Sequence, residues 1–165
     1  MLQVKVHHED LVRSLTVLQQ EFQRTCSNAV VETAAELVSN IVSKTLGPPP
    51  GPPPKYYKRT YRLVHGWGPA ARLFNIYMPP LSPVALTSSD EGVAYFLDNE
   101  NGAFFKAENK VPYAYEVEHV GTWKTPWPKL RGGYNIVGSS EQEMAKPDKF
   151  PKNVQDAWEL ALNAS

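Results

Sequence analysis

The chain has 165 residues, enough for one domain with a hydrophobic core. Its 17 basic and 17 acidic residues balance, so no overall charge attracts it to nucleic acid or to a membrane surface. The one cysteine, Cys26, excludes an intrachain disulfide and a metal site built from several cysteines. No apolar run approaches the roughly 20 residues that span a bilayer, and residues 1–10 lack the apolar core of a signal peptide. We therefore expect a soluble, intracellular-type chain that folds as a single domain over residues 1–165.

Residues 1–46 predict an extended arm followed by a long amphipathic helix. Apolar and polar residues alternate over Leu2–His7, which is typical of a short strand or an extended arm. Glu9 or Asp10 is expected to cap the helix. Apolar residues then recur in steps of three or four, which places them on one helix face for about nine turns. This stripe consists of Leu11, Leu15, Leu18, Phe22, Cys26, Val30, Ala34, Leu37 and Ile41.

The stripe leaves two alternatives open. Thr25, Ser27 and Asn28 are poor helix formers near its middle, so one long helix or a kinked pair would fit. The stripe is also longer than a small sheet can cover, so either part of it meets another subunit or its own domain covers it entirely. We interpret Cys26, which lies on the stripe, as a small buried hydrophobe.

Residues 47–58 form a proline-rich connector. Gly47 and Pro48 are expected to end the helix. The six prolines of Pro48–Pro54 exclude a helix or a central strand and favour polyproline II. The segment is either a rigid spacer or a ligand for a domain that binds polyproline helices, and we favour the spacer. The basic, tyrosine-rich patch Lys55–Arg62 that follows is a weak candidate for binding single-stranded nucleic acid.

Residues 59–138 predict a mainly antiparallel, β-rich region, because short aromatic segments alternate with glycine and proline. The turn-rich segment Asp98–Gly102 is expected to join two of its strands as a hairpin. Val111–Trp123 fits a strand or a short helix, and we favour the helix. Strands are expected at Tyr61–Trp67, Ala71–Met78, Gly92–Leu97, Ala103–Ala107 and Tyr134–Val137.

Residues 139–165 are expected to hold a linker and a last helix. The segment Gly138–Lys149 is polar, whereas Val154, Trp158 and Leu162 recur every four residues after Pro151. The predicted fold class is α+β: a long N-terminal amphipathic helix, or a kinked pair, packs on a mainly antiparallel β-sheet, followed by a short C-terminal helix.

Residue types that carry catalysis or bind metals occur here without the spacing that such chemistry needs. The four histidines do not have the spacing of a zinc site, and the glycine pairs lack a phosphate-binding context. No nucleophile motif occurs. We therefore expect no enzyme, no metal and no cofactor. Aromatic loops that carry Trp67, Trp123 and Trp127 instead favour protein–protein contacts, because tryptophan is enriched at interface hot spots.

Two segments about fifty residues apart form a joint pattern. The first is PKYYKRTYRL, in which Arg59, Thr60 and Leu63 fit an R-T-x-x-L-like motif. The second is PYAYEVEHVGT, which fits a Y-A-x-x-x-E-x-G-T-like motif with one extra residue before Gly121. This order, after a long helix and a proline-bearing turn, resembles the neck or tail-completion proteins of long-tailed bacteriophages, also called minor capsid or head–tail connector proteins.

The resemblance implies a structural virion protein without a catalytic site. Such proteins assemble as a ring, commonly a hexamer, between the head connector and the tail tube. The implied partners are further copies of the chain, head-closure or connector proteins, and tail-tube or tail-terminator proteins. Double-stranded DNA passes only as cargo, and no membrane is involved. The implied location is the neck of the virion, and the host cytoplasm during assembly.

The resemblance also suggests roles for the motif residues. Arg59 is expected to pair with Glu118 and fix helix to sheet, Thr60 to bond backbone, and the Trp123–Trp127 loop to contact neighbours. Alternatively, both motifs only stabilise the fold. The candidate motif and interface residues are Tyr57, Arg59, Thr60, Leu63, Tyr113, Ala114, Glu118, Gly121, Trp123 and Trp127. Two alternative functions remain: a tail terminator that caps the tail tube, and an adaptor whose polyproline stretch recruits a partner protein.

Overall fold

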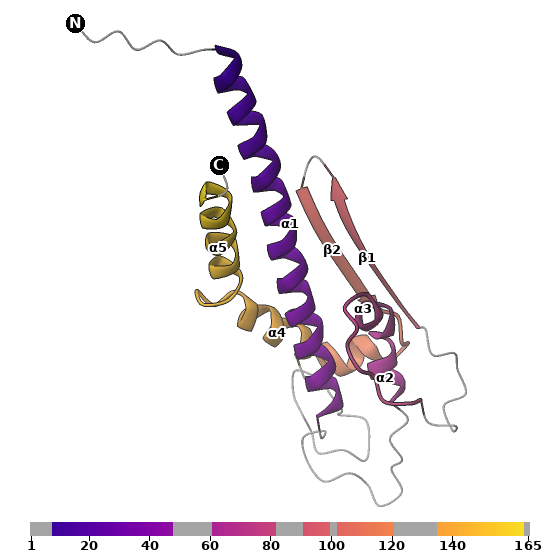
Figure 1. Cartoon of the computed structure of the whole chain (residues 1–165). Coiled ribbons are helices and arrows are strands. Elements are labelled where there is room, and N and C mark those ends of the chain that lie inside the picture. The colour runs from indigo at the N-terminus through magenta and orange to yellow at the C-terminus, as the bar shows by residue number, and fades with distance from the viewer. Residues whose placement is uncertain (1–7, 48–60, 82–90, 100–101, 121–134, 164–165) are drawn as a thin grey trace, which may run out of the picture.

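A computed structural model of the chain describes residues 8–47, 61–81, 91–99, 102–120 and 135–163. The fold is α+β, as predicted: one long helix packs on a two-stranded antiparallel sheet, and short helices follow towards the C-terminus. Figure 1 shows the hairpin on one side of the long helix and the C-terminal helix on the other. The predicted arm over residues 2–7 and the proline-rich connector after Gly47 lie outside the described residues.

The long helix α1 runs unbroken from His8 to Leu46. The hydroxyls of Thr25 and Thr33 donate to carbonyls one turn back, at Glu21 and Ala29, which satisfies both hydroxyls within the helix. The prediction that Glu9 or Asp10 caps α1 is wrong. Both lie inside the first turn, where the positive end of the helix dipole attracts their negative charge and stabilises it.

The predicted hairpin is confirmed, with strands β1 (Gly92–Asn99) and β2 (Gly102–Asn109). The strands pair antiparallel, with Phe96 opposite Phe105. The inner face, which includes Ala94, Phe105 and Ala107, packs against the core beside α1. At the hairpin tip, the hydroxyl of Ser27 on α1 donates to Oδ1 of Asp98 at 2.8 Å. This bond ties the end of the sheet to the middle of the helix.

The predicted strands Tyr61–Trp67 and Ala71–Met78 are wrong. The chain forms the short helices α2 (Arg62–His65) and α3 (Gly68–Leu73) there, and no further strand follows to Leu81. Tyr61 has φ 59°, a left-handed conformation that turns the backbone into α2. The start of α3 carries a proline, the position where proline is favoured in a helix.

The core lies where α3 meets the C-terminal half of α1. Its buried members are Val38, Val42, Val64, Ala70 and Ala71. Because the two alanines are small, the backbone of α3 can approach α1 closely, which a chain of β-branched strand residues would prevent. The burial of the two alanines in this contact therefore favours a helix here, rather than the strand that the aromatic composition predicted.

The C-terminal part is more helical than predicted. The expected strand Tyr134–Val137 is wrong from Ile136 onward, because helix α4 spans Ile136–Met144 and replaces most of the expected polar linker. Helix α5 covers Phe150–Asn163, so the predicted last helix is confirmed with an earlier start. The short helix that we favoured for the segment Val111–Trp123 is also confirmed, as a π-helical turn over Glu116–Val120.

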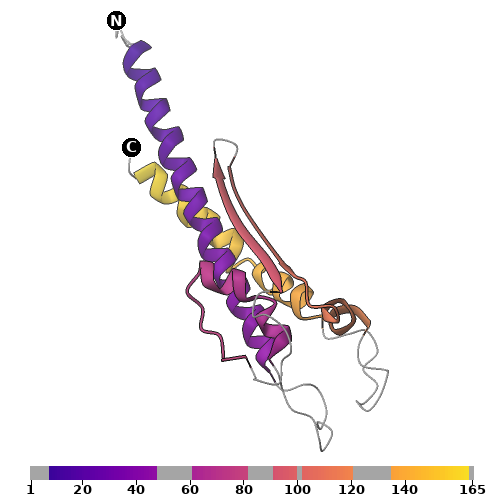
Figure 2. The same ribbon diagram turned by 90° about the vertical axis from the view of Figure 1, so that its right-hand side faces the viewer.

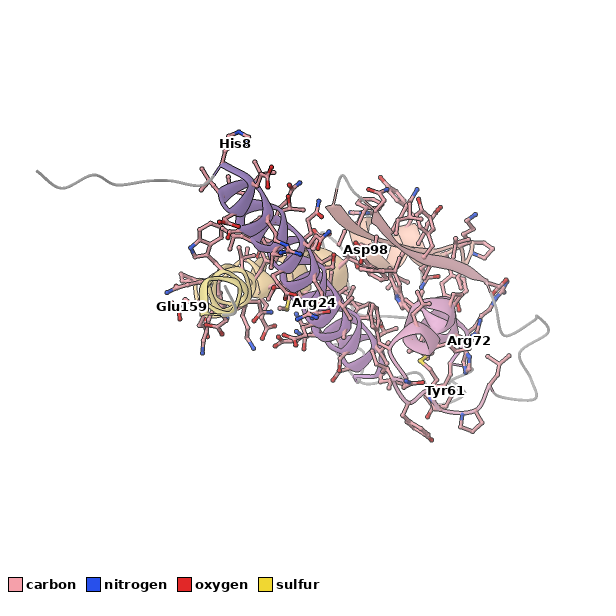
Figure 3. All side chains as sticks on the ribbon, turned by 45° about the horizontal axis from the view of Figure 1, so that its top comes forward. His8, Arg24, Tyr61, Arg72, Asp98 and Glu159 are labelled. Atoms are coloured by element: carbon pink, nitrogen blue, oxygen red, sulfur yellow. The ribbon has the colours of Figure 1, made fainter. Side chains whose placement is uncertain are left out.

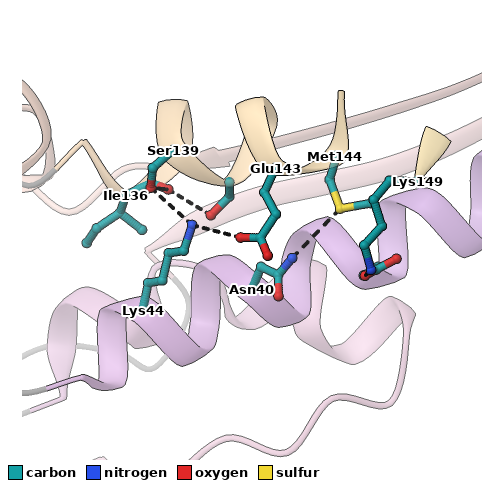
Figure 4. A network of polar contacts seen from close by, with 9 residues as sticks. Asn40, Lys44, Ile136, Ser139, Glu143, Met144 and Lys149 are labelled. Atoms are coloured by element: carbon teal, nitrogen blue, oxygen red, sulfur yellow. Dashed lines mark hydrogen bonds and ion pairs between the residues drawn. The ribbon is translucent and has the colours of Figure 1, made fainter. Parts of the chain in front are cut away.

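Polar contacts hold α4 and α5 against α1. Figure 4 shows Lys44 between Ser139 Oγ at 3.1 Å and Glu143 Oε2 at 3.4 Å, and Asn40 Nδ2 at 3.7 Å from the sulfur of Met144. Further along α1, an ion pair joins Lys149 and Glu36, and this contact raises the pKa of Lys149. Figure 2 shows the result, a helix layer of α1, α4 and α5 behind the curved hairpin.

Candidate functional site

Four of the ten candidate motif residues lie in the part of the chain that the structure describes. Leu63 lies in α2, Tyr113 and Ala114 precede the π-helical turn, and Glu118 lies within it. The remaining candidates lie outside the described residues: Tyr57, Arg59, Thr60, Gly121, Trp123 and Trp127. The roles expected for these six residues therefore stay predictions.

The structure brings the described ends of the two motifs together. Leu63 from the first motif and Ala114 and Glu118 from the second line one open pocket of about 270 Å³. We call this place the motif junction. It lies between the end of α1, the base of the hairpin and the start of α4, and its other lining residues are Thr45, Trp67, Ala107, Glu108, Asn109, Tyr115, Val117, His119, Ile136 and Val137.

Glu118 caps helix α4 across the junction. Its Oε2 accepts the backbone N–H of Ile136 at 2.8 Å, and Oε1 accepts those of Val137 at 2.7 Å and Gly138 at 3.3 Å. These N–H groups belong to the first turn of α4 and have no partner within the helix. A carboxylate at this end of a helix also interacts favourably with its dipole. The described partners of Glu118 are thus the N–H groups of α4, whereas its expected partner Arg59 lies outside the described residues.

Arg62 joins the first motif to both the hairpin and the second motif. Its Nε and Nη2 donate to the two carboxylate oxygens of Glu91, each at 2.6 Å. The hydrogen bond to Glu91 raises the pKa of Arg62. On the other side, the guanidinium carbon lies 5.8 Å from the ring centroid of Tyr113, within reach of a cation–π contact. The sequence prediction included Tyr113 but missed Arg62 and Glu91, because no spacing rule links residues 29 positions apart.

A tight backbone crossing completes the junction. The side-chain amide of Asn109, at the end of β2, donates to the carbonyl of Leu63 at 2.9 Å and accepts the N–H of Val111 at 3.1 Å. Where β1 begins, a Cβ atom on Gly92 would lie 1.9 Å from the carbonyl oxygen of Gly66. Only glycine at position 92 permits this approach, so the sequence between the motifs is adapted to hold them together.

Several polar or titratable side chains at and near the junction make contacts within the fold. Glu118 caps α4, and the ring of His119 lies 4.6 Å from that of Tyr115. Nearby, Nε2 of His65 lies 2.7 Å from the carbonyl oxygen of Pro79. Among the described residues, no three histidine, cysteine, aspartate or glutamate side chains form a group that could hold a metal ion.

Two exposed apolar surfaces lie away from the junction. The first, which we call the helix ridge, consists of the exposed Leu11 and Leu15 and the half-buried Leu18 and Phe22 on α1, with the exposed Val154 and Trp158 on α5. The second, the outer hairpin face, carries Val93, Tyr95, Leu97 and Phe104, with Lys106 opposite Tyr95 and Glu108 opposite Val93. Figure 3 shows Glu159 on α5 and Asp98 on the hairpin on opposite sides of α1.

None of the described helices is long and apolar enough to span a membrane.

Comparison with known proteins gave no match to any family model, to any curated protein or to any solved structure.

Proposed function

We propose that this chain is a structural protein of a bacteriophage neck, which forms a ring between the head connector and the tail tube. In this proposal it acts by assembly and carries out no catalysis. Its partners are further copies of itself, in a ring that we expect to be hexameric, with head-closure or connector proteins on one side and tail-tube or tail-terminator proteins on the other. DNA passes through the ring as cargo, and the assembled protein belongs to the virion.

The observation that carries the proposal is the motif junction. The proposal began from two short motifs that resemble one family, and two short motifs far apart in a chain are weak support when each is taken alone. In the fold, Leu63 of the first motif and Ala114 and Glu118 of the second line the same pocket. Arg62 and Tyr113 add a direct contact between the two segments. Two motifs that form one structural unit support the family resemblance better than two motifs that lie apart in the fold.

The order of the elements also supports the proposal. The family resemblance implies an N-terminal helix, the first motif, a sheet and then the second motif. The chain places α1 first, then α2 with Leu63 at the end of the first motif, then β1 and β2, and then the π-helical turn with Glu118 of the second motif. In this proposal, the function of the two motifs is to hold α1, the hairpin and α4 in one fixed arrangement.

The experiment is a mass measurement of the purified full chain, alone and mixed with the head-closure and tail-tube proteins encoded beside it, followed by two-dimensional averaging of the particles. We expect closed rings with a central channel. A chain that stays monomeric both alone and with those proteins would contradict the proposal. Rings that bind only the end of assembled tail tubes, and stop their growth, would favour the tail terminator instead.

A further inference from the structure

We propose that the hydrogen bond between Ser27 and Asp98 is a latch that holds the hairpin closed against α1. In this proposal the base of the hairpin is fixed, and its tip opens away from α1 when the latch breaks. The inference goes beyond the proposed function and does not depend on it, because both partners of the latch belong to one chain.

The base of the hairpin is fixed by several contacts with the motif junction. Just before β1, the carboxylate of Glu91 accepts two hydrogen bonds from Arg62. The backbone carbonyl of Glu91 also accepts the N–H of Lys110 at 2.7 Å, which closes the ladder at this end. At the end of β2, the side chain of Asn109 donates to the carbonyl of Leu63 at 2.9 Å. Movement of the base would break all of these bonds together.

The inner face of the hairpin is apolar towards the base and charged at the tip. Ala94, Phe105 and Ala107 pack against the core cluster. Asp98 lies on the same face of β1 as Ala94, because residues at even spacing share one face of a strand. Its side chain is nevertheless exposed. At this position the hairpin is therefore held by a polar contact, which water can replace, and not by apolar packing.

The Ser27 hydroxyl has an unusual direction for a hydroxyl on α1. Four threonine hydroxyls of this helix donate to the carbonyl four residues back: Thr16, Thr25, Thr33 and Thr45. The hydroxyl of Ser27 instead donates across to Oδ1 of Asp98 at 2.8 Å. Ser27 is only 8% exposed, so the bond to Asp98 satisfies a buried polar group.

Both partners of the latch have another hydrogen bond to make when the hairpin opens. The hydroxyl of Ser27 can donate to the carbonyl of Gln23, four residues back, as the threonine hydroxyls do. The carboxylate of Asp98, which is already exposed, binds water. Because neither group is left without a partner, the open and closed arrangements differ by little more than the net value of one hydrogen bond. The latch is thus a contact that can break without unfolding the chain.

The hairpin is also free to bend along its length. Among the described residues its sheet has two strands, so no third strand stiffens it. Figure 2 shows the two strands curving together beside α1. From Val93 to Asn99 the strand is about 20 Å long, so a bend of about 15° near the base would move the tip by about 5 Å. Such a movement would uncover the half-buried Phe96 and Ala103 on the inner face.

Distances between pairs of spin labels on the full chain test the proposal. In a Cys26→Ala background, Glu32→Cys with Leu97→Cys reports the tip, and Glu32→Cys with Val93→Cys reports the base. All three labelled positions are exposed. Labelled chain is diluted in excess unlabelled chain, so that each distance lies within one chain. We expect Ser27→Ala to raise the population with a longer tip distance about tenfold, as for loss of a hydrogen bond to a charged group, and to leave the base distance unchanged.

Thr25→Ala is the matched control, because Thr25 lies two residues away and its hydroxyl donates within α1. We expect it to change neither distance. Asp98→Ala should raise the same population as Ser27→Ala, and the double variant should add little, since both changes remove one bond. Asp98→Asn keeps an acceptor oxygen and should have a smaller effect.

Two results overturn the latch. One is an unchanged tip distance in both Ser27→Ala and Asp98→Ala. The other is an equal lengthening of the tip and base distances, because the base would then not be fixed. Far-UV circular dichroism of each variant confirms that the helices are retained. Because every distance is measured within one chain, the result does not depend on whether the chain forms rings.

Discussion

The carboxylate of Glu118 accepts the backbone N–H of Val137 at 2.7 Å, across 19 positions of sequence. This bond and those to the neighbouring N–H groups anchor α4 to the second motif. Since α4 in turn contacts α1 through Lys44 and Asn40, Glu118 connects the motif junction to the longest element of the fold. Glu118, which belongs to the family pattern, is therefore a helix cap. Its loss would affect the contacts of α4 with α1 as well as its own hydrogen bonds.

A Glu118→Ala variant is expected to destabilise the chain by about 1–2 kcal/mol, the usual cost of removing a helix cap. Glu118→Gln keeps one acceptor oxygen and should lose less. Urea unfolding of both variants measures the difference. Glu141→Ala serves as the control, because Glu141 lies exposed on the same helix and away from its first turn. Equal stability of Glu118→Ala and the unmodified chain would show that α4 does not depend on this cap.

Substitution of Gly92 by alanine is expected to cost about 1–3 kcal/mol, the range for overpacking a tight contact. The added Cβ would meet the backbone carbonyl of Gly66 at 1.9 Å, and a backbone atom cannot rotate away as a side chain can. Val93→Ala is the matched control next in sequence, since Val93 is exposed on the outer hairpin face. Thermal unfolding should give a clearly lower midpoint for Gly92→Ala than for Val93→Ala, and the reverse order would contradict the close crossing.

The features that local sequence determines were predictable, and those that depend on distant contacts were not. The stripe from Leu11 to Ile41 and the turn residues Asp98–Gly102 predicted α1 and the hairpin, because periodicity and turn chemistry act over a few residues. The helices α2 and α3 were mistaken for strands, because aromatic residues flank these short segments (Tyr61, Trp67 and Phe74) and suggested strands. What decides is the burial of Ala70 and Ala71 against α1, which no local pattern contains.

The same division holds for the motif junction. The paired motifs indicated that Leu63 and Glu118 belong to one pattern, and the structure places both on one pocket. The start of α4 was missed, because its first turn is capped by Glu118 from 18 positions upstream. The bidentate pair of Arg62 and Glu91 was missed as well, because a single charged residue in a sequence normally indicates a solvated surface position.

Replacing Arg62 by lysine is expected to weaken the junction although the charge is kept. Only a guanidinium can donate to both oxygens of Glu91 in parallel and lie over the Tyr113 ring. The melting temperature of Arg62→Lys should therefore fall, and that of Arg62→Ala should fall further. A double-mutant cycle with Glu91→Gln isolates the pair. If the two single losses simply add, the pair does not contribute as a unit.

Cys26 gives a prediction for pH. Burial on α1 raises the pKa of its thiol, so the folded chain favours the protonated form. The stability that results is fully present below the pKa of the unfolded thiol, about 8.5, and is lost as pH rises through the higher folded value.

The rate of reaction with a thiol-specific reagent, followed from pH 7 to 10, should show a higher midpoint for the native chain than for the same chain in urea. Because only the thiolate reacts, the native thiol should also react slowly at neutral pH. A native midpoint equal to or below the unfolded one would mean that α1 leaves Cys26 open to water, and the stripe would then be uncovered further towards its middle than the Phe22–Trp158 contact indicates.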